Sequence, residues 1–112
     1  MNFPSQLDFL EKFGIEPLSI DTDTGLETYE ILQNDLTLRF SFSEVLRSFQ
    51  IILAYKGTPT CRVCSEAVKS VKIVETSAAT GLNVEFDFHG VISESTITIY
   101  PHIGVNWHAL IK

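Results

Sequence analysis

The clearest strand pattern in this sequence lies at residues 36–43, which read Leu-Thr-Leu-Arg-Phe-Ser-Phe-Ser. Apolar side chains occupy every second position, and polar side chains fill the positions between them. A strand with this period of two turns one face to a core and the other face to water. A second clean alternation lies at residues 82–88, Leu-Asn-Val-Glu-Phe-Asp-Phe. Both stretches are typical of a half-buried antiparallel sheet.

Several further stretches are rich in β-forming residues or alternate over a shorter length. We expect strands at residues 26–32, 49–55, 69–75, 96–100 and 105–109. Residues 49–55 carry apolar side chains on both faces, which favours a central strand covered on both sides. Residues 61–70 fit both a helix and a strand, and the sequence leaves these two alternatives open. Most connections are too short for helical crossovers, so the sheet is expected to be antiparallel.

One helix is expected, near the N-terminus, at about residues 5–13. Ser5 precedes an apolar series, and Asp8 follows three residues later, as in a capping box. Gly14 supplies the stop signal. The sequence therefore predicts an α+β fold, in which this helix packs on a mostly antiparallel twisted sheet of five to seven strands. Residues 1–112 are expected to form a single domain.

The composition narrows the class of protein. The chain has 112 residues, 45% of them hydrophobic, and a formal net charge of −6. This hydrophobic content argues against disorder, and the negative charge argues against nucleic acid as a partner. The longest apolar run, residues 51–55, is far too short to span a membrane. The first residues lack the features of a signal peptide, so a cytoplasmic location is expected.

The negative charge is concentrated in the first third of the chain. Residues 1–35 hold eight acidic residues and one basic residue, a net −7, whereas residues 36–112 hold six acidic and seven basic residues, a net +1. An acidic surface of this kind steers a basic partner toward it. The candidate partner-binding residues are Asp21, Asp23, Glu27, Glu30 and Asp35, and the mixed face around Arg39 and Glu85 is the alternative surface.

Two cysteines form a Cys-x-x-Cys pair, Cys61 and Cys64. Thiolates at this spacing can share a zinc ion or form a redox disulfide. A zinc site needs two more ligands, and His102 and His108 lie far along the chain. We therefore expect no metal and no cofactor, and we interpret the cysteines as small, partly buried residues.

No motif in the sequence indicates catalysis. Glu85 and Asp87 share one face of the strand expected at residues 82–88, and paired carboxylates can perform acid–base chemistry. The simpler interpretation is that they form the wet side of that strand. A nucleophile elbow, a Walker motif and a dinucleotide-binding glycine motif are all missing from the sequence. The sequence thus gives no support for an enzyme.

A small acidic chain with an opening helix, a strand meander and the ending Ile97-Thr98-Ile99-Tyr100-Pro101-His102-Ile103-Gly104-Val105-Asn106-Trp107 resembles a known class. It looks like the immunity proteins that bacteria make beside their polymorphic or contact-dependent growth-inhibition toxins. The resemblance is one of architecture and charge. It implies a cytosolic inhibitor that binds one cognate toxin, often a basic nuclease, by protein–protein contact.

Two other functions stay open at this point. The first is a small interaction module or oligomeric subunit of another bacterial assembly, since a strand-rich chain offers sheet edges to a partner. The second is an enzyme that depends on zinc or on carboxylates, using Cys61, Cys64 or Glu85.

Overall fold

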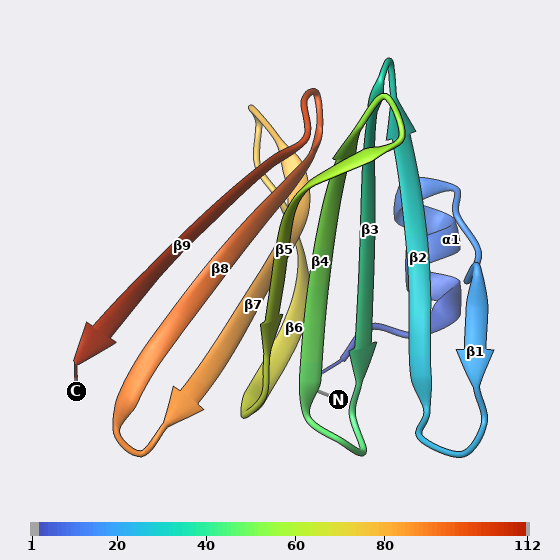
Figure 1. Ribbon diagram of the computed structural model, residues 1–112. Coiled ribbons are helices and arrows are strands. Elements are labelled where there is room, and N and C mark those ends of the chain that lie inside the picture. Colours follow the sequence, from blue (N-terminus) through green and yellow to red (C-terminus); the bar gives the residue numbers. More distant parts are fainter. Residues whose placement is uncertain (1–2, 112) are drawn as a thin grey trace. The chain divides into compact units, whose positions relative to one another are not determined.

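The computed structural model describes the backbone of residues 3–111 and the side chains of residues 3–107. The chain divides into two compact units, of which one is Ser5–Glu66 and the other holds the rest of the described chain. Each unit contains one antiparallel sheet (Figure 1). The expectation of a single domain remains a prediction. Among the described residues, no helix combines the length and the apolar character that crossing a membrane requires.

The helix α1 (Gln6–Phe13) begins and ends where its capping residues predict. The Asp8 amide donates to the Ser5 hydroxyl (3.2 Å), and the Ser5 amide donates to the Asp8 carboxylate (2.8 Å). This reciprocal pair is a capping box in which Asp replaces the usual Glu or Gln. At the other end, Gly14 adopts a left-handed φ of 69°, and its amide donates to the Leu10 carbonyl (2.9 Å). The helix predicted at residues 5–13 is confirmed.

Five strands in chain order form the first sheet. They are β1 (Ser19–Asp21), β2 (Leu26–Gln33), β3 (Leu36–Ser43), β4 (Ser48–Tyr55) and β5 (Thr58–Ser65). Every neighbouring pair is antiparallel, so the sheet is a simple meander. The strands expected at residues 26–32, 36–43 and 49–55 are confirmed.

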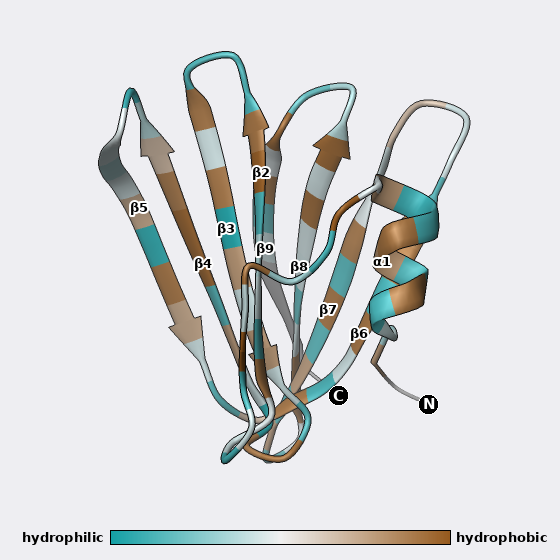
Figure 2. Ribbon diagram, turned by 90° about the vertical axis from the view of Figure 1, so that its right-hand side faces the viewer, coloured by the Kyte–Doolittle hydropathy of each residue, from teal (hydrophilic) through white to brown (hydrophobic). Residues whose placement is uncertain are grey.

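The two faces of this sheet differ in chemistry, and the period-two pattern assigns them. The inner face carries the aromatic and aliphatic side chains of β2, β3 and β4, and α1 packs against it. The Phe9 ring lies 4.3 Å from the Tyr29 ring and 5.8 Å from both the Phe40 and Phe42 rings, measured between centroids. Figure 2 shows the resulting brown and teal bands along β3 and α1. The helix is thus fixed by an aromatic cluster in the core.

We call the opposite side of the sheet the outer face. It is defined by Thr28 and Glu30 of β2, Arg39 and Ser41 of β3, Gln50 and Ile52 of β4, and Arg62 and Cys64 of β5. The expectation that residues 49–55 are covered on both sides holds for one side: Phe49 and Ile51 are buried on the inner face, whereas Gln50, Ile52 and Ala54 are half-buried.

The second sheet has four strands in chain order, β6 (Val68–Glu75), β7 (Thr80–Phe88), β8 (Val91–Tyr100) and β9 (Gly104–Ile111). Leu82, Val84 and Phe86 are fully buried on one face of β7, as their alternation predicts. The Phe86 ring stacks on the Trp107 ring of β9 with 4.8 Å between centroids. Strand β8 begins at Val91, which is five residues before the stretch predicted from β-forming residues.

The predicted number and grouping of strands is wrong. The described residues form nine strands in two antiparallel sheets, rather than five to seven strands in one sheet. The sequence pattern did not predict β1 and β5 as strands, because their side chains are almost all exposed. An edge strand is held by backbone hydrogen bonds to one neighbour, so its side chains need no apolar alternation. The open alternative at residues 61–70 is settled as the end of β5 and the start of β6.

Candidate functional site

The structure places two of the five predicted partner-binding residues together. Asp21 is the last residue of β1, and Asp23 lies in the turn that follows; both are exposed. One Asp21 carboxylate oxygen accepts hydrogen bonds from the amides of Asp23 (2.9 Å) and Thr24 (3.4 Å). Asp21 therefore shapes this turn, as an aspartate at the start of a turn commonly does. Asp23 is the freer of the two carboxylates for a partner.

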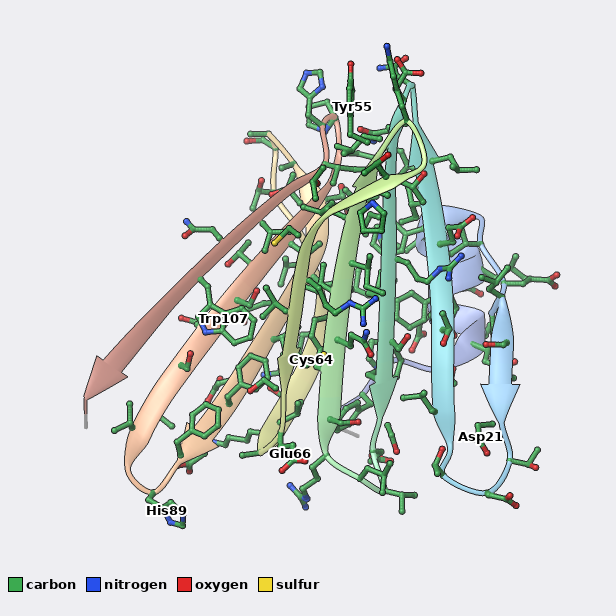
Figure 3. The ribbon with its side chains drawn as sticks, viewed as in Figure 1. Asp21, Tyr55, Cys64, Glu66, His89 and Trp107 are labelled. Atoms are coloured by element: carbon green, nitrogen blue, oxygen red, sulfur yellow. The ribbon has the colours of Figure 1, made fainter. Side chains whose placement is uncertain are left out.

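The other three predicted residues lie elsewhere on the sheet. Asp35 is in the turn between β2 and β3, at the end of the sheet opposite Asp23, and the intervening strand spans about 25 Å. Figure 3 shows these two ends, with Asp21 labelled at the lower end and Tyr55 at the upper end. Glu27 and Glu30 are an odd number of residues apart on β2, so they point to opposite faces. The five residues do not form one patch, and their role in binding a partner remains a prediction.

Glu27 serves the interior of the first unit. It accepts a hydrogen bond from the Tyr29 hydroxyl (2.8 Å), which satisfies the polar end of a fully buried ring. Burial, together with this hydrogen bond and the charge of Glu27, raises the pKa of Tyr29 above its ordinary value of 10.0. The carboxylate of Glu27 is thus an acceptor that the fold itself uses.

Acidic and apolar residues that the sequence analysis did not single out lie at the same end of the sheet as Asp23. The Ser43 hydroxyl donates to the Thr24 carbonyl (2.7 Å) and accepts from the Leu46 amide (3.0 Å). These bonds tie the turn after β1 to the turn at residues 44–47. That second turn carries Glu44 and two exposed aliphatic side chains, Val45 (77% exposed) and Leu46 (53%). No local sequence pattern predicts that these two turns lie side by side, because hydrogen bonds between residues far apart in the chain bring them together.

A row of charged side chains crosses the outer face at right angles to the strands. The strand register aligns Glu30 with Arg39, Arg39 with Ile52, and Ile52 with Arg62. Arg39 donates to one oxygen of Glu30 through Nε (3.1 Å) and a terminal nitrogen (2.6 Å). Glu30, a predicted partner-binding residue, is therefore already paired within its own sheet. The side chain of Arg62 has no hydrogen-bond or ion-pair partner among the described residues.

Two shallow depressions lie beside this row. One, of about 230 Å³, includes both arginines, and its lining is Glu30, Thr37, Arg39, Ile52, Ala54, Gly57, Pro59 and Arg62. The other, of about 380 Å³, is lined by Leu26, Ser41, Ser48, Phe49, Gln50, Cys64, Ser65 and Glu66. Both linings mix polar side chains with apolar ones such as Phe49 and Ile52. The outer face thus has two depressions that are lined by hydrogen-bonding groups and by charged side chains.

The Cys-x-x-Cys pair lies on β5, and its geometry decides between the alternatives that the spacing left open. Cys61 pairs in register with Leu53 of the inner face, whereas Cys64 pairs with Gln50 of the outer face. Their α-carbons are about 10 Å apart along the strand, and their side chains point to opposite faces. Such a pair can neither close an intramolecular disulfide nor bind one metal ion together.

Both cysteines are exposed, so the expectation that they are partly buried is wrong. The edge position of β5 explains the difference, since only one neighbouring strand covers it. The side chain of His108, named above as a candidate zinc ligand, lies outside the described side chains. Among the described residues, no group of three or more His, Cys, Asp or Glu side chains is arranged to hold a metal ion.

Glu85 and Asp87, the other candidate chemical pair, lie on the polar face of the second sheet. Glu85 forms an ion pair with Lys69 (3.3 Å), and Asp87 accepts from the Gly90 amide (3.3 Å) in the turn after β7. Glu94 stands opposite Glu85 in the register and accepts from the Asn83 amide nitrogen (2.9 Å). Each carboxylate therefore has a partner that stabilises the sheet.

Comparisons with known proteins identify the fold. No protein-family model matches the sequence, and no curated protein matches it. A solved structure does match: a chain of the contact-dependent growth inhibition toxin–immunity protein complex from Klebsiella pneumoniae 342. The TM-score is 0.90 at 23% sequence identity, and the match covers 97% of this chain and 96% of that chain. This protein shares its fold with a chain of a toxin–immunity complex.

The resemblance to this class, predicted from architecture and charge, is thereby confirmed for the fold. A match over 97% of the chain includes α1 and both sheets, so it concerns the whole arrangement of elements within each unit. At 23% identity the likeness carries over the backbone plan and leaves the side chains to be judged on this chain's own geometry.

Proposed function

We propose that this chain is an immunity protein that binds a cognate bacterial toxin domain and neutralises it by protein–protein contact in the cytoplasm. The observation that carries this proposal is the fold shared, at a TM-score of 0.90, with a chain of a toxin–immunity complex. The role needs no catalytic group, cofactor, membrane or nucleic-acid partner, but it does need an accessible surface.

The charge of the chain favours the immunity side of such a complex and a nuclease as the toxin. A nuclease has to bind a polyanion, which demands positive charge at its binding surface. This chain instead has a net charge of −6, with −7 in residues 1–35. Opposite charge on the two proteins raises the rate at which they associate, and a rapid encounter suits an inhibitor.

The proposal predicts that the gene directly upstream of the gene for this chain encodes a toxin. The C-terminal domain of that toxin is expressed from an inducible promoter in cells that do or do not produce this chain. We expect growth arrest without the chain and growth with it, together with a stable complex of the two purified proteins. Growth arrest in both strains, with no complex in solution, would sink the proposal. A toxin domain from an unrelated system is the specificity control.

The alternative is an interaction module or an oligomeric subunit of another assembly. It is favoured by β5, an edge strand whose side chains are nearly all exposed and whose backbone can pair with a further strand. Size-exclusion chromatography coupled to light scattering separates the two functions. A stable homo-oligomer that does not change when the toxin is added supports the alternative, whereas a monomer that forms a complex with the toxin supports immunity.

A further inference from the structure

The outer face of the first sheet combines three features that a protein-docking surface needs. It is accessible at Arg39, Arg62 and Cys64, which are exposed, and partly accessible at Gln50 and Ile52, which are half-buried. Its floor is made of small or half-buried side chains such as Thr28, Ser41 and Ile52. It also carries Arg62, an exposed arginine without a partner among the described side chains, at the rim of a depression of about 230 Å³.

We propose that the toxin docks on this outer face and places a carboxylate of one of its acidic side chains between Arg39 and Arg62. This inference rests on the proposed function and adds the surface and the recognition chemistry. The two guanidinium groups flank Ile52 in one register row, so a carboxylate entering the depression can meet both. Arginine binds carboxylates through paired hydrogen bonds, and it is common among residues that dominate interface energies.

The charge balance of the row argues for a single carboxylate rather than a nucleic acid. Glu30 offsets one of the two arginines, so Glu30, Arg39 and Arg62 together carry +1. Residues 5–66 as a whole hold ten acidic and five basic residues, a net −5. A polyanion would be repelled by that surrounding negative charge. One acidic side chain on an otherwise basic partner instead complements the +1 of the row, while the rest of the partner complements the −5 of residues 5–66.

The hydrogen-bonding groups beside the row extend the same surface. Thr28 and Ser41 form a hydrogen bond with each other (2.9 Å), so their side chains are held in place before a partner arrives. The neighbouring depression of about 380 Å³ adds Gln50 and Cys64 on the same face. A pre-ordered polar surface loses little conformational entropy on binding. The proposed docking surface therefore includes both depressions, and Arg39 and Arg62 line the smaller one.

The two cysteines allow a test without any substitution, because Cys64 lies on the outer face and Cys61 on the inner face. The protein is alkylated with iodoacetamide, with and without saturating toxin domain, and modification of each cysteine is followed by peptide mass spectrometry. We expect the toxin to slow alkylation of Cys64 about tenfold, as water is excluded from the centre of an interface, and Cys61 to change much less. Equal protection of both cysteines, or protection of Cys61 alone, would overturn the proposal.

A second test changes the charge of Arg62. We expect Arg62→Glu to raise the Kd for the toxin domain by at least about 30-fold, since it removes a buried charge pair and adds a repulsion. The matched control is Lys72→Glu, an exposed residue of β6 in the other sheet with the same change in charge, for which we expect less than about threefold. Equal losses in both variants would show that only overall charge matters.

These outcomes are separable from failure of the proposed function. If the wild-type chain does not bind the toxin at all, the immunity role fails. If the wild type binds and Arg62→Glu binds equally well, only the docking surface fails. Fluorescence anisotropy with a labelled single-stranded RNA is the remaining arm: tight RNA binding that Arg62→Glu abolishes would overturn the choice of a carboxylate. Circular dichroism and thermal melting confirm that each variant is folded.

Discussion

The inner and outer faces of the first sheet are built from the same strands and differ in residue type and burial. On the inner face, Phe40 and Tyr29 are fully buried beneath α1, with ring centroids 5.4 Å apart. On the outer face, Arg39 lies one residue along the same strand, and its side chain is 47% exposed. The difference arises because alternate residues of one strand point to opposite faces of the sheet. One set of residues packs in the core, while the alternate set lies on the face where we propose that the toxin binds.

The largest effect that separates the two faces is expected from Phe40→Ala. The substitution leaves a cavity beside Phe9 and Tyr29, and such changes cost about 3–5 kcal/mol in the free energy of unfolding. Urea denaturation followed by circular dichroism measures this loss. The matched variant on the outer face is Arg39→Ala, which breaks an exposed ion pair and is expected to cost no more than about 1 kcal/mol. Comparable costs in the two variants would contradict the division between the faces.

A pH series distinguishes the buried phenol of the inner face. Folding raises the pKa of Tyr29 above 10.0, so above pH 10 the unfolded chain loses this proton while the folded chain keeps it. The free energy of unfolding therefore falls as pH rises above 10, by about 1.4 kcal/mol per pH unit from this group. We expect Tyr29→Phe to show a correspondingly smaller fall between pH 10 and pH 11 in urea denaturation. Equal slopes in wild type and variant would refute this account.

The attachment of α1 to the inner face is tested at its cap. Ser5→Ala removes the hydroxyl that accepts from the Asp8 amide, and losing such an N-cap costs about 1 kcal/mol. A modest drop in the urea midpoint is the expected result. Ser5→Asp keeps an acceptor at the cap and serves as the control, with stability close to that of the wild type. A loss of stability as large as that of Phe40→Ala would mean that the cap does more than end the helix.

The smallest effect is expected at the two ends of the sheet, where the charges act at long range. Reversing Asp23 and Asp35 together, as Asp23→Lys and Asp35→Lys, removes negative charge without touching either face. We expect the association rate with a basic toxin to fall several-fold at low salt and to converge with the wild-type rate at high salt, because salt screens such steering. Stopped-flow kinetics across a salt series measures it.

Arg62→Ala is the comparison for the Asp23→Lys, Asp35→Lys variant, because it removes a proposed direct contact. We expect Arg62→Ala to lower the affinity at high salt as well as at low salt, and to do so by raising the dissociation rate. If the charge-reversed chain and the wild type associate at equal rates at every salt concentration, the acidic segment plays no part in binding. In that case only the outer face, and not the ends of the sheet, would contribute to toxin binding.

Much of the fold followed from local patterns. The capping residues Ser5 and Gly14 set the bounds of α1, and strict alternation identified β3 and β7 with their buried faces. What failed was the count of strands and their division into two sheets. Strand β5 has almost no apolar alternation, since an edge strand is held by its backbone, and the sequence carries no local signal for that.

The candidate site followed from the sequence only in part. The sequence shows that the acidic residues are concentrated in residues 1–35, but it does not show which of them lie close together in the folded chain. Glu30 is paired with Arg39, Glu27 binds the Tyr29 hydroxyl, and Asp35 is at the far end from Asp23. The partners of a charge come from neighbouring strands or from the face on which it points. One-dimensional charge counting contains neither piece of information.

The sequence by itself determined the helix, the main strands with their buried faces, and the concentration of negative charge in residues 1–35, because these depend on composition and on short-range periodicity. Only the tertiary structure decided which charges meet. It aligned Glu30, Arg39, Ile52 and Arg62 in one row, and it turned Cys61 and Cys64 to opposite faces. The physical reason is register: hydrogen bonds between strands fix which residues face each other, and a shift of one residue would exchange the two faces of the sheet.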